Sequence, residues 1–138
     1  RKMLDEIARQ NLQDSVLIIP GLKPDDPLLP SAYKAAEMFV LPTANEPFGI
    51  VILESWAAGT PVIATRVGGI PGFTADEENI LLTEDNDETM LTGKMERLAA
   101  SPELRAKLAK NGLVEVSSKY DWSAIAARVI AIYEEVLK

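Results

Sequence analysis

Hydrophobic positions along the chain follow two patterns, a helical spacing and a set of short continuous runs. The first twelve residues have apolar side chains at helical intervals, which predicts an amphipathic helix. Four apolar runs follow, each short enough for one strand, at 16–19, 38–41, 61–65 and 80–82. Continuous apolar runs of this length are typical of strands that are buried on both faces of a sheet.

Helical segments separate these runs and follow the last of them. Ser31 is a suitable cap for a short helix over 32–37. Gly59 is a suitable end for a helix that opens in the loop before Ile50 and runs on from that residue. Three more helices are expected at about 87–100, 102–118 and 122–137, with caps at Asp87, Ser101 and Asp121 and a first-turn Pro102. Strands separated by helices predict an α/β fold, a mainly parallel Rossmann-like sheet with flanking helices. The chain shows no repeat or linker, so residues 1–138 are expected to form one domain.

Two loops follow predicted strands at the edge where open parallel sheets bind ligands, 42–49 and 65–79. In the first, Pro47 suits the opening turn of a helix, because proline lacks the amide hydrogen that would be unpaired there. The amides of Phe48, Gly49 and Ile50 would then be free donors at a helix N-terminus. Such an end has partial positive charge and readily holds a phosphate.

Two carboxylates bracket this segment, Glu46 and Glu54. If both lay on one helix they would be about 12 Å apart along its axis, too far for an acid–base pair acting on one bond. They could instead hold the two ends of an elongated ligand through its hydroxyl groups. The competing interpretation is that Glu46 only complements the helix dipole and that Glu54 is solvated.

The amino-acid composition excludes several classes of binding and catalytic site. The net charge of −7 argues against nucleic-acid binding, because phosphate backbones are bound mainly by clustered Lys and Arg. The chain has no Cys and no His, which excludes disulfides, thiolate metal sites, Ser-His triads and His-ligated zinc within it. No apolar run approaches the roughly 20 residues of a membrane helix, and the start is not a signal peptide. Because the chain opens in mid-helix without Met, we expect a piece of a longer or processed protein.

The segment from Leu41 to Ile70, with its Glu-Pro-Phe-Gly-Ile-Val-Ile-Leu-Glu and Gly-Thr-Pro-Val-Ile-Ala-Thr sequences, resembles retaining glycosyltransferases of group 1, glycosyltransferase family 4. The tail, with Ser-Pro-Glu-Leu-Arg and Tyr-Asp-Trp-Ser, is similar too. The resemblance implies the C-terminal, donor-binding half of a cytoplasmic enzyme with two Rossmann domains. That enzyme would transfer a hexose from a nucleotide diphosphate sugar to a sugar, lipid or polysaccharide acceptor, without a metal or other cofactor.

The resemblance also implies roles for individual residues. Glu46 would be the catalytic-site residue that binds the donor sugar hydroxyls. The amides of Phe48, Gly49 and Ile50 would face the sugar and the diphosphate, and Glu54 would hold the ribose. Gly21 and Leu22 would lie against the base.

This sequence departs from the family pattern in several places. The acceptor domain would lie upstream of this chain, and so would the basic residues that clamp the diphosphate. Gly72 stands where the family usually has Glu, and Ile80 stands where it usually has Gly. Only the last four of six family strands are expected. We therefore expect the chain alone to be inactive, and to rearrange its sheet or form a homodimer through an exposed sheet edge.

Two other function classes compete. One is a non-catalytic nucleotide-sugar-binding or interaction module of the same fold. The other is a phosphoacceptor α/β domain, which is disfavoured because Pro20 and Gly21, not acidic residues, follow the first strand, and no suitable Lys follows Leu82.

Several remaining residues have simpler structural interpretations. Trp56 and Trp122 are expected to pack, Arg66 to lie on the surface, and Gly68 and Gly69 to serve a turn with positive φ. The acidic turns at 76–78 and 84–87 are expected to be solvated and to bind no metal.

Overall fold

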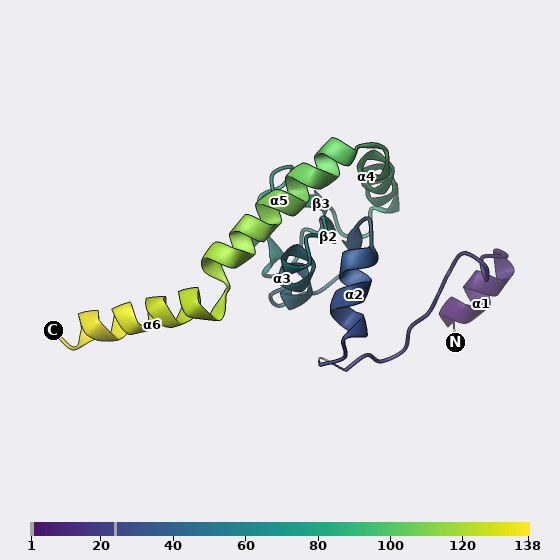
Figure 1. Cartoon of the computed structure of the whole chain (residues 1–138). Helices are drawn as coiled ribbons and strands as arrows, with labels where there is room; N and C mark the ends of the chain where they lie inside the picture. Colours follow the sequence, from purple (N-terminus) through teal and green to yellow (C-terminus); the bar gives the residue numbers. More distant parts are fainter. Residues whose placement is uncertain (1, 24) are drawn as a thin grey trace.

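A three-stranded parallel sheet forms the centre of the computed structural model, which describes residues 2–23 and 25–138 (Figure 1). Its strands are β1 (Phe39–Leu41), β2 (Val62–Thr65) and β3 (Leu81–Thr83), hydrogen-bonded in that order. The crossovers contain α3 (Ile50–Ala57) and the short 3-10 helix η1 (Ile70–Gly72). The predicted α/β class with a parallel sheet and flanking helices is therefore confirmed.

Alternate residues of the central strand build two hydrophobic clusters. Val62 and Ala64 belong to a cluster that includes Ile52 and Trp56 of α3. Ile63 belongs to a second cluster, with Leu98 of α4 (Glu88–Ala100) and Leu108 of α5 (Pro102–Lys119). All four residues of β2 are buried, as the uninterrupted apolar run predicts for a strand covered on both faces.

The predicted first strand, residues 16–19, is wrong. These residues form no strand, and their apolar side chains are exposed, Leu17 to 83%. The preceding helix α1 (Lys2–Arg9) has no buried residue and lies apart from the sheet, as Figure 1 shows. An isolated apolar run gains neither ladder hydrogen bonds nor burial, so its propensity alone does not make it a strand. The expected closing of the gap beside β1 is absent in the described chain, and β1 is an edge strand.

Most predicted helix ends are confirmed. Asp87, Ser101 and Asp121 accept amide hydrogen bonds at the starts of α4, α5 and α6 (Trp122–Val136). Gly59, with φ +78°, closes α3 with bonds typical of the Schellman motif, from Thr60 N to the Ser55 carbonyl and from Gly59 N to that of Trp56.

The predicted cap at Ser31 is wrong. Helix α2 (Leu28–Ala35) begins four residues earlier than predicted, and the Asp26 carboxylate accepts the Leu28 amide at 2.9 Å. Ser31 lies inside the helix and donates to the Pro27 carbonyl. The first amide of this helix is therefore bonded by an upstream carboxylate and not by Ser31.

The two tryptophans differ. Trp56 is fully buried, as predicted, whereas Trp122 is 82% exposed, so its predicted packing role is wrong. Helix α6 has no buried residue and extends away from the body beyond α5 (Figure 1). Among the described helices, none has the length and apolarity that would let it cross a bilayer.

Candidate functional site

The Glu46 loop, defined as residues 46–49, is held against the segment that follows β2. The Gly69 amide donates to the Glu46 carbonyl at 3.0 Å. A Cβ at Gly68 would lie 2.0 Å from that same carbonyl oxygen, and one at Gly69 would lie 2.3 Å from the Pro47 carbonyl oxygen. Gly68 has the predicted positive φ of +54°, but Gly69 has φ −81°, so the prediction is wrong there. Gly69 is needed for close backbone approach instead.

Helix α3 starts later than the sequence predicts. Its first residue is Ile50 and its N-cap is Gly49 with φ +103°, so Pro47 lies outside the helix. The Phe48 amide donates to Glu46 Oε1 at 3.2 Å, and it is therefore not a free donor. Within the described chain, the amides of Gly49 and Ile50 have no acceptor. Two of the three predicted donors therefore remain free at the positive end of α3.

The late helix start also changes the relation between the two carboxylates. Because Glu46 lies before α3, the spacing of about 12 Å, which assumes one continuous helix, does not apply. Glu46 is half-buried beside the α3 N-terminus, and Glu54 is exposed on the second turn of the same helix. The free amides lie between the two carboxylates along the chain, and joint binding of one ligand by both carboxylates stays a prediction.

Glu54 faces a hollow of about 390 Å³ between α2 and α3. The Tyr33 hydroxyl donates to Glu54 Oε2 at 3.1 Å. Burial, followed by this bond to a carboxylate, raises the pKa of Tyr33 to about 12. Sequence reasoning missed Tyr33, since nothing in the local pattern shows that α2 would bring it to Glu54.

The predicted base-contacting residues are not joined to this site. Gly21 is exposed with φ +58°, and Leu22 is half-buried. Among the described residues, no hydrogen bond links either of them to the Glu46 loop or to Glu54. The expectation for Gly21 and Leu22 therefore stays a prediction.

Phe48 of the Glu46 loop belongs to a group of four aromatic rings that contact one another, which we call the aromatic cluster: Phe48, Trp56, Phe73 and Tyr120. Phe48 stacks on Phe73 with ring centroids 5.0 Å apart. Tyr120, at the end of α5, meets both of these rings edge-on, at 6.2 and 6.0 Å. Trp56 meets Phe73 edge-on at 5.9 Å. Such offset and edge-to-face pairs are the favourable geometries for aromatic side chains.

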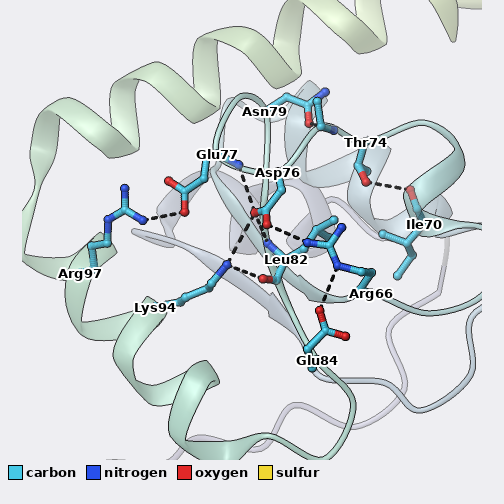
Figure 2. Close-up of polar contacts among 11 residues, drawn as sticks. Arg66, Ile70, Thr74, Asp76, Glu77, Asn79, Leu82, Glu84, Lys94 and Arg97 are labelled. Atoms are coloured by element: carbon cyan, nitrogen blue, oxygen red, sulfur yellow. Dashed lines mark hydrogen bonds and ion pairs between the residues drawn. The ribbon is translucent and has the colours of Figure 1, made fainter.

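A polar network around Asp76 joins the segment between β2 and β3, residues 66–80, to β3 and to α4 (Figure 2). Arg66 pairs with Asp76 at 2.8 Å and with Glu84 at 3.1 Å, which confirms its predicted surface role. Asp76 also accepts from the amides of Leu82 and Glu77, at 2.8 and 3.1 Å. The prediction of a merely solvated turn is wrong for Asp76, because its carboxylate fixes this segment to β3.

Glu77, the residue after Asp76, pairs with Arg97 of α4 at 2.7 Å. A hydrogen bond from Arg97 lowers the pKa of Glu77. Across residues 2–23 and 25–138, no cluster of three or more acidic side chains is arranged to hold a metal ion.

A family model and several curated proteins match this chain. The family described as Glycosyl transferases group 1 matches residues 1–114. The D-inositol 3-phosphate glycosyltransferase of Saccharomonospora viridis is 34% identical over 137 residues, which cover 99% of this chain and 31% of the relative. The chain thus spans about a third of the length of that relative.

Two solved structures superpose on nearly the whole of this chain. The sucrose-phosphate synthase of Thermosynechococcus elongatus is 34% identical and superposes with a TM-score of 0.87, over 99% of this chain and 34% of that one. The Anabaena protein HepE, solved with UDP-glucose, has the same fold at 24% identity and a TM-score of 0.84, over 97% of this chain and 36% of that one.

Proposed function

The chain belongs to the glycosyl transferases of group 1, and we propose that it is the donor-binding, C-terminal domain of a retaining hexosyltransferase. In this proposal the donor is a nucleotide diphosphate sugar and the acceptor is a sugar, lipid or polysaccharide bound by another part of the protein. The observation that carries the proposal is the constrained Glu46 loop, which presents a carboxylate beside two free amides at the start of α3.

Each element of the site suits one part of such a donor. The Glu46 carboxylate accepts the Phe48 amide at Oε1, and its other lone pairs accept hydrogen bonds from the sugar hydroxyls. The amides of Gly49 and Ile50 donate to the diphosphate, which lets an acidic chain bind an anion without a local cation. Glu54 accepts from the ribose hydroxyls, with Tyr33 orienting its carboxylate.

Transfer needs the diphosphate to leave with its charge stabilised. Fixed dipoles at the start of α3 do this without reorganising during the reaction. We propose that no metal is required and that the anomeric configuration is retained. Transfer by the full-length protein in excess EDTA, with the product anomer assigned by NMR, tests both statements.

The decisive experiment is calorimetric titration of the chain with UDP, GDP and ADP and their hexose conjugates, beside Glu54→Ala. UDP and UDP-glucose come first, because the Anabaena protein of the same fold holds UDP-glucose. We expect saturable binding that weakens about tenfold or more in Glu54→Ala, since a charge-assisted hydrogen bond contributes about 1.5–3 kcal/mol.

The matched control is Glu78→Ala, which removes an exposed carboxylate that pairs with Lys107. It should leave the affinity unchanged. Equal weakening by both variants, or no binding by the folded wild-type chain and by the full-length protein, would contradict the proposal.

The alternative function is a non-catalytic binding module of the same fold, and donor binding without transfer by the full-length protein would favour it. We also propose that the open edge of β1 allows homodimer formation, which sedimentation velocity over a range of concentrations tests. A cytoplasmic location is part of the same proposal, and cell fractionation tests it.

A further inference from the structure

The ring of Tyr120 is held rigidly at the junction of α5 and α6. The amides of Tyr120 and Asp121 both donate to the Val116 carbonyl, at 2.9 and 3.1 Å. Asp121 then caps α6, and the Arg128 guanidinium reaches back to the Lys119 carbonyl. The backbone on both sides of Tyr120 is therefore fixed by hydrogen bonds, and so is the direction of its Cα–Cβ bond.

That ring meets the Glu46 loop at one side chain, Phe48. Tyr120 lies edge-on to Phe48 and also to Phe73, on which Phe48 stacks. In the described chain the Tyr120 hydroxyl makes no hydrogen bond, so its ring, and not its polar atom, makes these contacts. Phe48 is 40% exposed, and in the described chain its aromatic contacts are with these two rings.

Restraint of Phe48 matters because of its amide. This amide donates to Glu46 Oε1 at 3.2 Å, and the next two amides in the chain are the free donors at the start of α3. The ring contacts restrain the movement of this residue, so without them the Phe48 amide would hold the Glu46 carboxylate for a smaller fraction of the time.

We propose that Tyr120 is a positioning residue for donor binding, which acts through Phe48 to hold the Glu46 carboxylate and the Gly49 and Ile50 amides in their binding geometry. The inference rests on the proposed function, because it assumes that the Glu46 loop binds the sugar and diphosphate. It adds a residue more than 60 positions away in the sequence, at the junction of two helices.

A first experiment needs no ligand. Hydrogen exchange by NMR compares wild type, Tyr120→Leu, Tyr120→Phe and Trp122→Leu, the last an exposed aromatic two residues away that is outside the aromatic cluster. In Tyr120→Leu, exchange of the Phe48 amide should accelerate about tenfold, the effect of losing two aromatic contacts. The amides of β2 should keep their wild-type rates, and Tyr120→Phe and Trp122→Leu should behave as wild type.

A second experiment measures the donor. Titration with UMP, UDP and UDP-glucose should show Tyr120→Leu weakening UDP-glucose and UDP about tenfold while leaving UMP, which retains the ribose contact, nearly unchanged. A purely structural loss would weaken all three ligands equally, accelerate exchange in β2, and overturn the proposal. Unchanged Phe48 exchange in Tyr120→Leu would overturn it as well.

The two experiments separate the two proposals. If neither the wild-type chain nor the full-length protein binds any of these ligands, the proposed function is refuted, and with it the role of Tyr120 in donor binding. Altered Phe48 exchange with normal wild-type binding but no change in UDP-glucose affinity refutes the positioning role alone.

Discussion

The contact between Gly112 of α5 and Trp56 of α3 allows a sharp test of how the helices pack. Gly112 is buried, and a Cβ there would lie 2.3–2.6 Å from three atoms of the Trp56 indole. Trp56 is fully buried and packs edge-on against Phe73, so its ring cannot simply move aside. We expect Gly112→Ala to destabilise the protein although alanine is the better helix former.

The magnitude follows from two opposing effects. The new methyl group must move about 1 Å to reach an ordinary contact distance, an overpacking that costs about 3 kcal/mol, the upper part of the usual range. The gain in helix propensity is about 1 kcal/mol, so the free energy of unfolding should fall by about 2 kcal/mol. Gly93 in α4 has no neighbour within 4 Å of its Cβ position, and Gly93→Ala should raise that free energy by about 1 kcal/mol.

Urea unfolding followed by fluorescence measures the difference. The chain has two tryptophans, and Trp122 is exposed, so a Trp122→Phe background makes Trp56 the reporter at little cost in stability. The two variants should differ by about 3 kcal/mol, which displaces their unfolding midpoints by more than 1 M urea. If Gly112→Ala proved as stable as Gly93→Ala, the close packing of α5 on Trp56 would be refuted.

Three further predictions concern the loops and the hollow. Gly68→Ala should cost at least about 2 kcal/mol of stability and weaken UDP-glucose binding, because of its positive φ and a clash with a backbone carbonyl; Gly72→Ala, with open space around it, should do neither. Asp76→Ala should cost about 1–3 kcal/mol in urea unfolding, since it orphans the Leu82 amide, and wild-type stability would contradict its central role. The raised pKa of Tyr33 favours folding below about pH 10 and loses that contribution as the pH rises towards 12. Unfolding measured between pH 9 and 12 should therefore show a smaller decline in Tyr33→Phe than in wild type.

The sequence predicted best the elements whose causes are local. The runs that became β1, β2 and β3 are buried or half-buried, and the caps at Asp87, Ser101 and Asp121 act within two or three residues of themselves. The Glu46 loop also stands out in the sequence, because a carboxylate, a proline and a glycine before an apolar helix form a local pattern, and its role in binding stays a prediction.

The failures share a physical reason, which is that they depend on partners distant in the sequence. The run at 16–19 has strand propensity but no strand beside it, so it stays exposed. Tyr33 meets Glu54 across 21 residues, and Tyr120 meets Phe48 across more than 70. Gly69 looks like a turn residue in the sequence, and only the fold shows that it allows two backbones to touch.

The exposed run at 16–19 also has a consequence for handling the protein at high concentration. Apolar side chains that face water, three of these four β-branched, promote association between copies once electrostatic repulsion is weak. The net charge of −7 supplies that repulsion at neutral pH, and it vanishes near the sequence pI of about 4.6. Light scattering should therefore rise steeply as solutions are acidified towards pH 4.6 or as added salt screens the charge. Replacing Leu17, the most exposed residue of the run, with Lys should reduce that rise, and colloidal stability is in this way linked to four residues outside the folded core.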